Sequence, residues 1–182
     1  YKDHGKSYAA VYETEQSPGY NWLHESFGTN WRMTEMQGVL GRIQLEKMSE
    51  WTAKRTANAQ AILKACSKWE SKGYLCVPRL EHLAQFSNTN HAYYKLYVYV
   101  QSDNLPDGWT RDRIIEVINN QGVPCFSGSA SEVYLEKAFD NTGLRPSIRL
   151  PMAKQLGESS LMFLVHPTLT AAEIELTIQA ID

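Results

Sequence analysis

The chain has 182 residues, 43% of them hydrophobic, so it can bury a core and is not expected to be disordered. Its 18 basic and 20 acidic residues nearly balance and form no Lys/Arg run, which argues against a nucleic-acid partner. No apolar run is long enough to span a bilayer, so we expect no membrane partner. The three cysteines, Cys66, Cys76 and Cys125, form no CxxC pair, which argues against a disulfide framework or a zinc site and favours a cytoplasmic location.

The first 32 residues are expected to be irregular. Gly, Pro, Tyr, His and Asn residues interrupt any period between residues 1 and 32, and the chain starts at Tyr1 instead of Met. Long irregular segments of compact proteins are usually functional or belong to an interface. We therefore expect residues 1–32 to face a site or an interface, and the chain to be a fragment.

Regular structure is predicted from Thr34 onward. Thr34 and Gln37 match a capping box, in which the two side chains satisfy free amides at the start of a helix. A second helix is predicted over residues 57–70, stopped by Gly73. The first helix has one apolar face, formed by Met33, Met36, Leu40 and Ile43.

The rest of the chain alternates short strands and helices. Strands are predicted at residues 75–77, 92–100, 123–126 and 161–165, and helices at 111–121, 132–139, 152–156 and from Thr170 to the end. Ser129 with Glu132, and Thr170 with Glu173, match two further capping boxes. This pattern predicts an α+β fold: a short, mainly antiparallel sheet with helices packed on one face, entered through a long helical segment.

Asn30 and Arg32 are the first candidates for chemistry. They lie just before the Thr34 cap, where an amide donor and a fixed positive charge can meet an anion near a helix N-terminus. The alternative is that Asn30 makes a local turn and Arg32 a surface ion pair, because Asn is favoured in turns. Trp31, between them, is interpreted as a packing residue.

The loop at residues 127–131 is the second candidate. It is rich in small hydroxyl residues and precedes a predicted helix, so it can receive a phosphate or a sugar hydroxyl; the alternative is an ordinary loop capped by Ser129. Cys125, in the strand before it, is expected to be a buried, inert thiol. The five histidines have no metal spacing, and no nucleophile elbow, dinucleotide-binding loop or P-loop is present.

One segment has a family resemblance. GTNWRMTEMQGVLGRIQLEKM, residues 28–48, resembles the GxNxRMxExQAAxGxxQL signature of the DegT/DnrJ family of pyridoxal-phosphate-dependent sugar aminotransferases. Other stretches agree in the same order: DHG at residues 3–5, a helix and GVP at 111–124, LPMA at 150–153, and the closing strand, His166-Pro167 and helix. The resemblance covers essentially all of this chain but only the C-terminal part of the family's.

The resemblance implies a type I aminotransferase, in which a large domain carries the cofactor lysine and a smaller C-terminal domain closes the active site. Residues 1–32 would continue from the missing large domain and face the interface or active site, and residues 33–182 would form the small domain. The Schiff-base lysine lies upstream of the matched segment. We therefore expect no catalytic residue in this chain, which should be inactive alone.

The resemblance also implies ligand contacts. In the family, the Asn of GxNxRM reaches the cofactor phosphate of the neighbouring subunit, so Asn30 takes that role, and Arg32 is a second cofactor-binding candidate.

Many relatives have a His-Tyr-Pro-like run where this chain has CFSGS, residues 125–129. We therefore expect Phe126, Ser127 and Ser129 to contact substrate where a His usually does. A second departure is Lys95, which stands where His is common and receives no role.

The leading hypothesis is the C-terminal portion of a homodimeric enzyme with shared active sites. With pyridoxal phosphate as cofactor, the enzyme would transfer an amino group, commonly from glutamate, to a nucleotide-linked keto-sugar for polysaccharide or amino-sugar synthesis. Two alternatives stay open: a cofactor-free binding or oligomerisation module, and a family member that has lost catalysis and serves as a regulator.

Overall fold

The structure, a computed structural model, describes residues 5–12, 18, 24–79 and 89–182. The chain divides into two compact units, Tyr1–Lys47 and Met48–Asp182. The division after residue 32 that the sequence suggests stays a prediction. Three residues discussed above, Asp3 and His4 of the DHG motif and His82, lie outside the described residues.

The first unit contains a short helix, α1 (Tyr8–Tyr12), inside the segment expected to be irregular. Gly5 anchors the described part of this segment, because its carbonyl accepts bonds from Glu25 N at 2.6 Å and Ser26 N at 3.1 Å. The backbone of Gly5 has φ +86, and an added Cβ would lie 2.0 Å from the Ser26 carbonyl oxygen. This close approach requires glycine.

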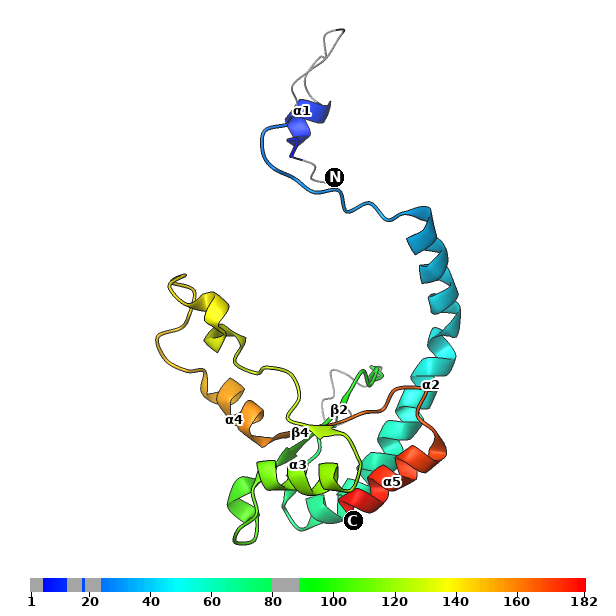
Figure 1. The fold of residues 1–182 in the computed structure, drawn as a ribbon, viewed down its shortest axis with the longest axis vertical. Helices are drawn as coiled ribbons and strands as arrows, with labels where there is room; N and C mark the ends of the chain where they lie inside the picture. The colour runs from blue at the N-terminus through cyan, green and yellow to red at the C-terminus, as the bar shows by residue number, and fades with distance from the viewer. Residues whose placement is uncertain (1–4, 13–17, 19–23, 80–88) are drawn as a thin grey trace. The chain divides into compact units, whose positions relative to one another are not determined.

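Helix α2 (Glu35–Ser71) is one continuous helix of 37 residues, whereas the sequence pattern predicted two (Figure 1). The prediction was wrong because the apolar period fades between residues 44 and 56, where the helix is mostly exposed. That stretch, QLEKMSEWTAKRT, contains no Gly or Pro and is rich in good helix formers. Glu50 and Lys54, four residues apart, form an ion pair of 2.8 Å that further stabilises the helix in this stretch.

The second unit is built on a four-stranded sheet in the order β1-β2-β4-β3, with every pairing antiparallel. Its strands are β1 (Leu75–Cys76), β2 (Leu96–Val100), β3 (Cys125–Phe126) and β4 (Ser160–Phe163). In the register, Val98 pairs with Leu161 and Tyr97 with Met162. Because side chains alternate along a strand, Val98 and Leu161 share one face of the sheet and Tyr97 and Met162 share the other.

Helices α2, α3 (Arg111–Asn120) and α5 (Ala171–Ile181) contribute to the core on the Val98 face. The core there includes Ile62, Val98, Ile118, Phe163 and Ile174, all of them buried. Helix α4 (Pro151–Ser159) contacts β2 from the other side, where its residues line a pocket with the tyrosines of β2. The α+β class and the short antiparallel sheet predicted from the sequence are confirmed, and α4 is an addition to the predicted single helical layer.

Two of the three predicted capping boxes form. At α2, Gln37 N donates to Thr34 Oγ1 at 3.3 Å and Thr34 N donates to Gln37 Oε1 at 2.9 Å. At α5, Thr170 Oγ1 accepts from Glu173 N while Glu173 accepts from Thr170 N. Both pairs satisfy amides that the first turn of a helix leaves without partners.

The third box, Ser129 with Glu132, is wrong, and so is the predicted helix at 132–139. The structure has two short 3-10 turns there, η4 (Val133–Leu135) and η5 (Lys137–Phe139), with Glu136 in extended conformation between them. The side chain of Glu132 does not reach back to the cap, because its carboxylate accepts bonds from Tyr134 at 2.6 Å and from the guanidinium of Arg149.

Arg149 and Tyr134 thereby hold the segment from 132 to 150. Tyr134 is buried and its hydroxyl also accepts from Leu150 N at 2.9 Å. The bond and the charge of Arg149 lower the pKa of Glu132 to about 2, with Tyr134 contributing. The segment is therefore organised by polar bonds and not by a helix.

Among the helices of the described ranges, none combines the length and the apolar composition required to cross a bilayer.

Candidate functional site

The first candidate site lies in the turn that leads into α2. Asn30 Oδ1 accepts a bond from Arg32 N at 3.3 Å and another from Arg32 Nε at 3.0 Å. These bonds turn the amide oxygen toward Arg32. The local turn considered as the alternative role of Asn30 is thus present, and it joins the two residues that the sequence singled out.

The donor set of this turn suits an anion. With Asn30 Oδ1 engaged by Arg32, the other polar groups of the two side chains are N–H donors of the amide and the guanidinium. Both residues are exposed, and they precede Thr34, the cap of α2. Amide and guanidinium donors beside a helix N-terminus are chemically matched to phosphate or carboxylate oxygens.

Trp31 does not pack within the described part of this chain. Its side chain is 87% exposed, and Phe27 and Met33 nearby are exposed as well. The interpretation of Trp31 as a packing residue is therefore wrong for this chain. Large apolar side chains that gather on a surface typically mark an interface.

The second candidate site is the loop after β3, which two strands hold in place. Ser160 Oγ in β4 donates to the carbonyl of Ser127 at 2.6 Å. Ser129 N donates to the hydroxyl of Tyr97 in β2 at 3.2 Å, and that hydroxyl lies 3.5 Å from Ser129 Oγ. Instead of capping a helix, Ser129 is thus fixed against β2.

Gly128 allows the loop to approach Tyr97. Its φ is +91, and a Cβ at this position would lie 2.3 Å from Tyr97 Cε1. Gly157 allows α4 to approach the other end of the loop, because a Cβ at this position would lie 2.1 Å from Ser131 Oγ. At Gly128 the ring contact and the positive φ together exclude a side chain, whereas at Gly157 the Ser131 hydroxyl would have to move to admit a Cβ.

A pocket of about 460 Å³ opens beside this loop on the Tyr97 face of the sheet. Phe126 belongs to the same face, because it pairs with Met162, the partner of Tyr97. Phe126 is 46% exposed. The pocket is lined by the following residues: Tyr97, Tyr99, Ser129, Ala130, Ser131, Ala153, Leu156 and Ser160.

Of the three substrate candidates, the structure brings Ser129 into the pocket and leaves Ser127 and Phe126 outside its lining. Sequence reasoning included Ser131 only as part of the 127–131 loop and missed Tyr97 and Ser160. The alternation of Tyr97 and Tyr99 with buried aliphatic residues in β2 was a usable signal, since it sets a polar aromatic face. Nothing in the sequence signalled Ser160, which comes from a distant strand. Asn30 and Arg32 belong to the first unit of the chain and the loop to the second.

Two phenols that line this pocket have shifted pKa values: burial raises the pKa of Tyr99, and the pKa of Tyr97 is lowered. Partial burial acts to raise its pKa, but the bonds from Ser129 and the charge of Lys95 together lower it. Its hydroxyl is therefore a somewhat better hydrogen-bond donor than that of an ordinary tyrosine.

The cysteines take no part in either site. Burial raises the pKa of Cys125 to about 11 and that of Cys66 to about 12, so both are thiols at neutral pH. This confirms the expectation of a buried, inert Cys125. Over the ranges that the structure describes, no cluster of His, Cys, Asp or Glu has the composition of a metal site.

Comparison with known proteins places the chain in a family. The model of the DegT/DnrJ/EryC1/StrS aminotransferase family matches residues 4–182. An aminotransferase from Psychrobacter cryohalolentis, solved by X-ray crystallography, is 80% identical, with a TM-score of 0.85; the match covers 100% of this chain and 46% of that chain. No curated protein matches.

Two more distant structures share the fold. NtdA from Bacillus subtilis, with bound cofactor PMP, is 17% identical with a TM-score of 0.68, over 90% of this chain and 35% of that one. Helicobacter pylori PseC, an aminotransferase involved in the biosynthesis of pseudoaminic acid, is 15% identical with a TM-score of 0.65. The match covers 98% of this chain and 42% of that one.

The chain spans less than half the length of each of these solved relatives. The family match extends over almost every residue, and the 80% identical structure is matched over the whole of this chain. The chain therefore belongs to the DegT/DnrJ/EryC1/StrS aminotransferase family.

Proposed function

We propose that this chain is the C-terminal portion of a pyridoxal-phosphate-dependent enzyme that transfers an amino group from glutamate to a nucleotide-linked keto-sugar. The observation that carries the proposal is the 80% identity, over all of this chain, to an aminotransferase. Because the match covers 46% of that relative, we assign the lysine that carries the cofactor to a part of the enzyme outside this chain. The chain alone is then inactive.

Enzymes of this family use pyridoxal phosphate. The cofactor supplies an electron sink for the charge that develops during amino transfer. In our proposal Asn30 and Arg32 bind its phosphate in the neighbouring subunit. The support is chemical, since the Arg32 bonds to Asn30 Oδ1 bring the amide and the guanidinium together, and the N–H groups of both side chains are suited to phosphate oxygens.

The loop after β3 is proposed to bind the sugar. Ser129 lines the pocket on the Tyr97 face, and hydroxyl groups that donate and accept are suited to sugar hydroxyls. The half-exposed ring of Phe126 offers an apolar surface to the sugar or its nucleotide. The bonds from Ser160 and to Tyr97 keep this loop in one conformation, which reduces the entropy lost on binding.

We further propose that the enzyme is a homodimer with shared active sites, without nucleic-acid or membrane partners. Support comes from the exposed apolar side chains near the start of α2, which are typical of an interface. They include Met33, Met36, Val39, Leu40 and Ile43. The free thiols of Cys66 and Cys125 support a cytoplasmic location, where thiols stay reduced.

The proposed activity is tested with the protein encoded by the complete gene. Purified protein is incubated with pyridoxal phosphate, glutamate and a panel of nucleotide-linked keto-sugars, and 2-oxoglutarate and the aminated sugar are measured. We expect stoichiometric formation of both with at least one sugar. Bound cofactor without transfer to any sugar would favour the regulatory alternative, and a protein that binds no cofactor would favour the binding module.

The place of the cofactor lysine has a separate test. Borohydride reduction fixes the cofactor to the lysine that carries it, and peptide mapping then identifies that lysine. A labelled peptide outside residues 1–182 is expected. A label on any lysine of this chain would show that the proposed division of the enzyme is wrong.

The role of Asn30 is tested by Asn30→Ala, with Asn120→Ala as a matched control. Asn120 is an exposed residue at the end of α3 and belongs to neither candidate site. A hydrogen bond to a charged group is worth about 1.5 to 3 kcal/mol, so cofactor retention in dialysis should weaken roughly 10- to 100-fold in Asn30→Ala alone. Equal retention in both variants would remove Asn30 from the site.

A further inference from the structure

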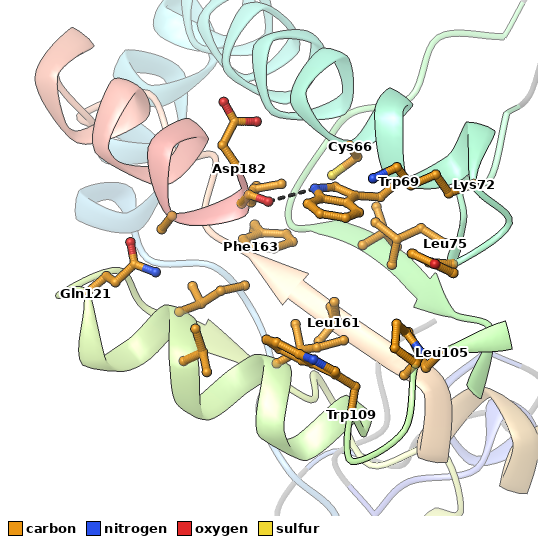
Figure 2. Close-up of a pocket in the computed structure, with 18 residues that line it drawn as sticks. Cys66, Trp69, Lys72, Leu75, Leu105, Trp109, Gln121, Leu161, Phe163 and Asp182 are labelled. Carbon is orange, nitrogen blue, oxygen red and sulfur yellow. Dashed lines mark hydrogen bonds between the residues drawn. The ribbon is translucent and has the colours of Figure 1, made fainter. Parts of the chain in front are cut away.

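The second unit contains a cavity of about 540 Å³ that the proposed function does not use. It lies on the Val98 face of the sheet, with Val98, Leu161 and Phe163 as its floor (Figure 2). Tyr97 and Ser160, which line the pocket beside the Ser127–Ser129 loop, alternate with these floor residues along β2 and β4. The two cavities therefore open on opposite faces of the same two strands.

The walls of the cavity are apolar. Helix α3 contributes Ile114, Val117 and Ile118, and helices α2 and α5 complete the enclosure. A volume of this size falls within the range of about 300 to 1,000 Å³ that is typical of small-molecule sites. The apolar lining and the volume together suit the hydrocarbon part of a small molecule.

Two tryptophans line the cavity, Trp69 of α2 and Trp109 before α3 (Figure 2). Each has a cation over its ring. Lys72 Nζ lies 4.6 Å from the Trp69 ring centroid, and the Arg113 guanidinium lies 5.0 Å from that of Trp109. The Trp69 indole N–H is already satisfied, since it donates to the carbonyl of Ile181 at 2.7 Å. Trp69 therefore offers the cavity no hydrogen-bond donor.

The charges beside the two tryptophans do not cancel. Asp182 is the acidic residue of the lining, and its carboxylate already pairs with Lys68 at 2.5 Å. Within the described part of the chain, Lys72 has no carboxylate partner, and Arg113 donates to a backbone carbonyl, that of Gly108. An apolar cavity with surplus positive charge beside its tryptophans is complementary to an apolar molecule that carries one negative group.

We propose that this cavity binds a small apolar carboxylate, with its hydrocarbon part against the partly exposed side chains of Leu105, Ile114 and Val117 and its carboxylate at Lys72. Figure 2 shows Lys72 on one side of the Trp69 indole and Asp182 on the other. Because Lys68 already occupies the Asp182 carboxylate, Lys72 is the cation of the lining that can meet the carboxylate of the ligand. The proposal goes beyond the aminotransferase assignment and does not depend on it.

The test compares two probes of equal chain length, decanoate and decanol, by calorimetry below the concentration at which they aggregate. The purified protein should bind both in a saturable way, decanoate more tightly, and quench the fluorescence of Trp69 and Trp109. Val117→Phe, which fills the cavity, should weaken binding of both probes roughly tenfold or more. Absence of saturable binding would show that the cavity is not a ligand site.

Lys72→Gln tests the contribution of the Lys72 charge separately from that of the apolar contacts. It is an exposed position, so the variant should fold, and decanoate should bind about 3- to 10-fold more weakly while decanol binding stays unchanged. Lys64→Gln is the matched control, because Lys64 is an exposed residue of α2, the helix that ends just before Lys72, and does not line the cavity. Equal loss for both probes, or an equal effect of Lys64→Gln, would overturn the proposed orientation of the carboxylate.

Discussion

The two ends of helix α2 carry apolar residues but differ in what surrounds them. Met36, Val39 and Leu40 near its start are 77%, 56% and 59% exposed, whereas Ile62 and Cys66 near its end are fully buried. Helical spacing of apolar residues predicts that a face will be covered, but it does not identify the partner. For the end of α2 the partner is the sheet of the same unit. For its start, the described part of the chain supplies none.

The comparison is tested most strongly by truncating one residue at each end. Ile62→Ala should destabilise the 182-residue chain by about 3 kcal/mol, because it opens a cavity in a packed core. Leu40→Ala, on the same helix, should change stability by no more than about 0.5 kcal/mol. Denaturant unfolding measures both. Similar losses would mean that the start of α2 is packed in solution, as in a dimer of this chain.

The second test concerns backbone approach in the loop after β3. Gly128→Ala adds a methyl group 2.3 Å from the Tyr97 ring in a backbone with φ +91, so we expect a loss of about 2 kcal/mol and a displaced loop. The amide resonance of Ser129 should report the lost bond to Tyr97.

Gly143→Ala measures the cost of the backbone conformation alone, without the contact that Gly128→Ala would make. Gly143 has φ +72, but an added Cβ there would have no neighbour within 4 Å. It should therefore lose only about 1 kcal/mol, the cost of the left-handed conformation. If the two variants lose the same stability, the loop does not lie against Tyr97 in solution.

The third test concerns the segment from 132 to 150, which polar bonds hold instead of a core. The guanidinium of Arg149 and the hydroxyl of Tyr134 lower the pKa of Glu132 from 4.5 to about 2. A depressed carboxyl pKa contributes stability above pH 4.5, and this contribution is lost as the pH falls from 4.5 toward 2. We place the effect below that of Gly128 because Arg149 is 48% exposed and the pair is screened by water.

Glu132→Gln removes the titrating group. The melting temperature of the unmodified chain should fall between pH 4.5 and 2, and that of the variant should fall less over the same interval. Glu136→Gln is the control, since Glu136 is exposed in the same segment and its side chain takes part in no ion pair among the described residues. Parallel pH profiles in all three proteins would contradict the assigned role of Glu132.

The three capping boxes show how much of the fold local sequence determines. The Thr34 and Thr170 boxes formed because, among the described residues, no other side chain bonds to the end groups of Gln37 and Glu173. The Glu132 box failed because Arg149, 17 residues away, takes the carboxylate. Local patterns therefore predicted the strands and most helices, but not which polar partner wins when a distant charge is available.

The same limit applies to the candidate sites. The motif around Asn30 was visible because Asn30 and Arg32 are two residues apart and bond to each other. The partners of the Ser127–Ser129 loop, Tyr97 and Ser160, lie more than 30 positions away, and only the folded sheet brings them to it. Ser129 was therefore found from its local sequence, whereas Tyr97 and Ser160, which position the loop, could not be found in this way.

The smallest expected effect compares two capping boxes of the same chemistry. Thr170→Ala removes a bond to Glu173 N at the start of α5, whose Ile174 is buried in the core, so it should destabilise the second unit by about 1 kcal/mol. Thr34→Ala removes the equivalent bond at the exposed start of α2. That end can fray without opening the core, so global unfolding should hardly change, while hydrogen exchange of Gln37 N accelerates.

The outcome also bears on what covers the start of α2. If Thr34→Ala lowers global stability as much as Thr170→Ala does, the first turn of α2 unfolds together with the core, which requires that a second molecule or another part of the enzyme holds it. If only exchange of Gln37 N changes, the cap matters locally. The turn that carries Asn30 and Arg32 then depends on the rest of the enzyme for its order, because the helix that follows it is stabilised there only by its cap.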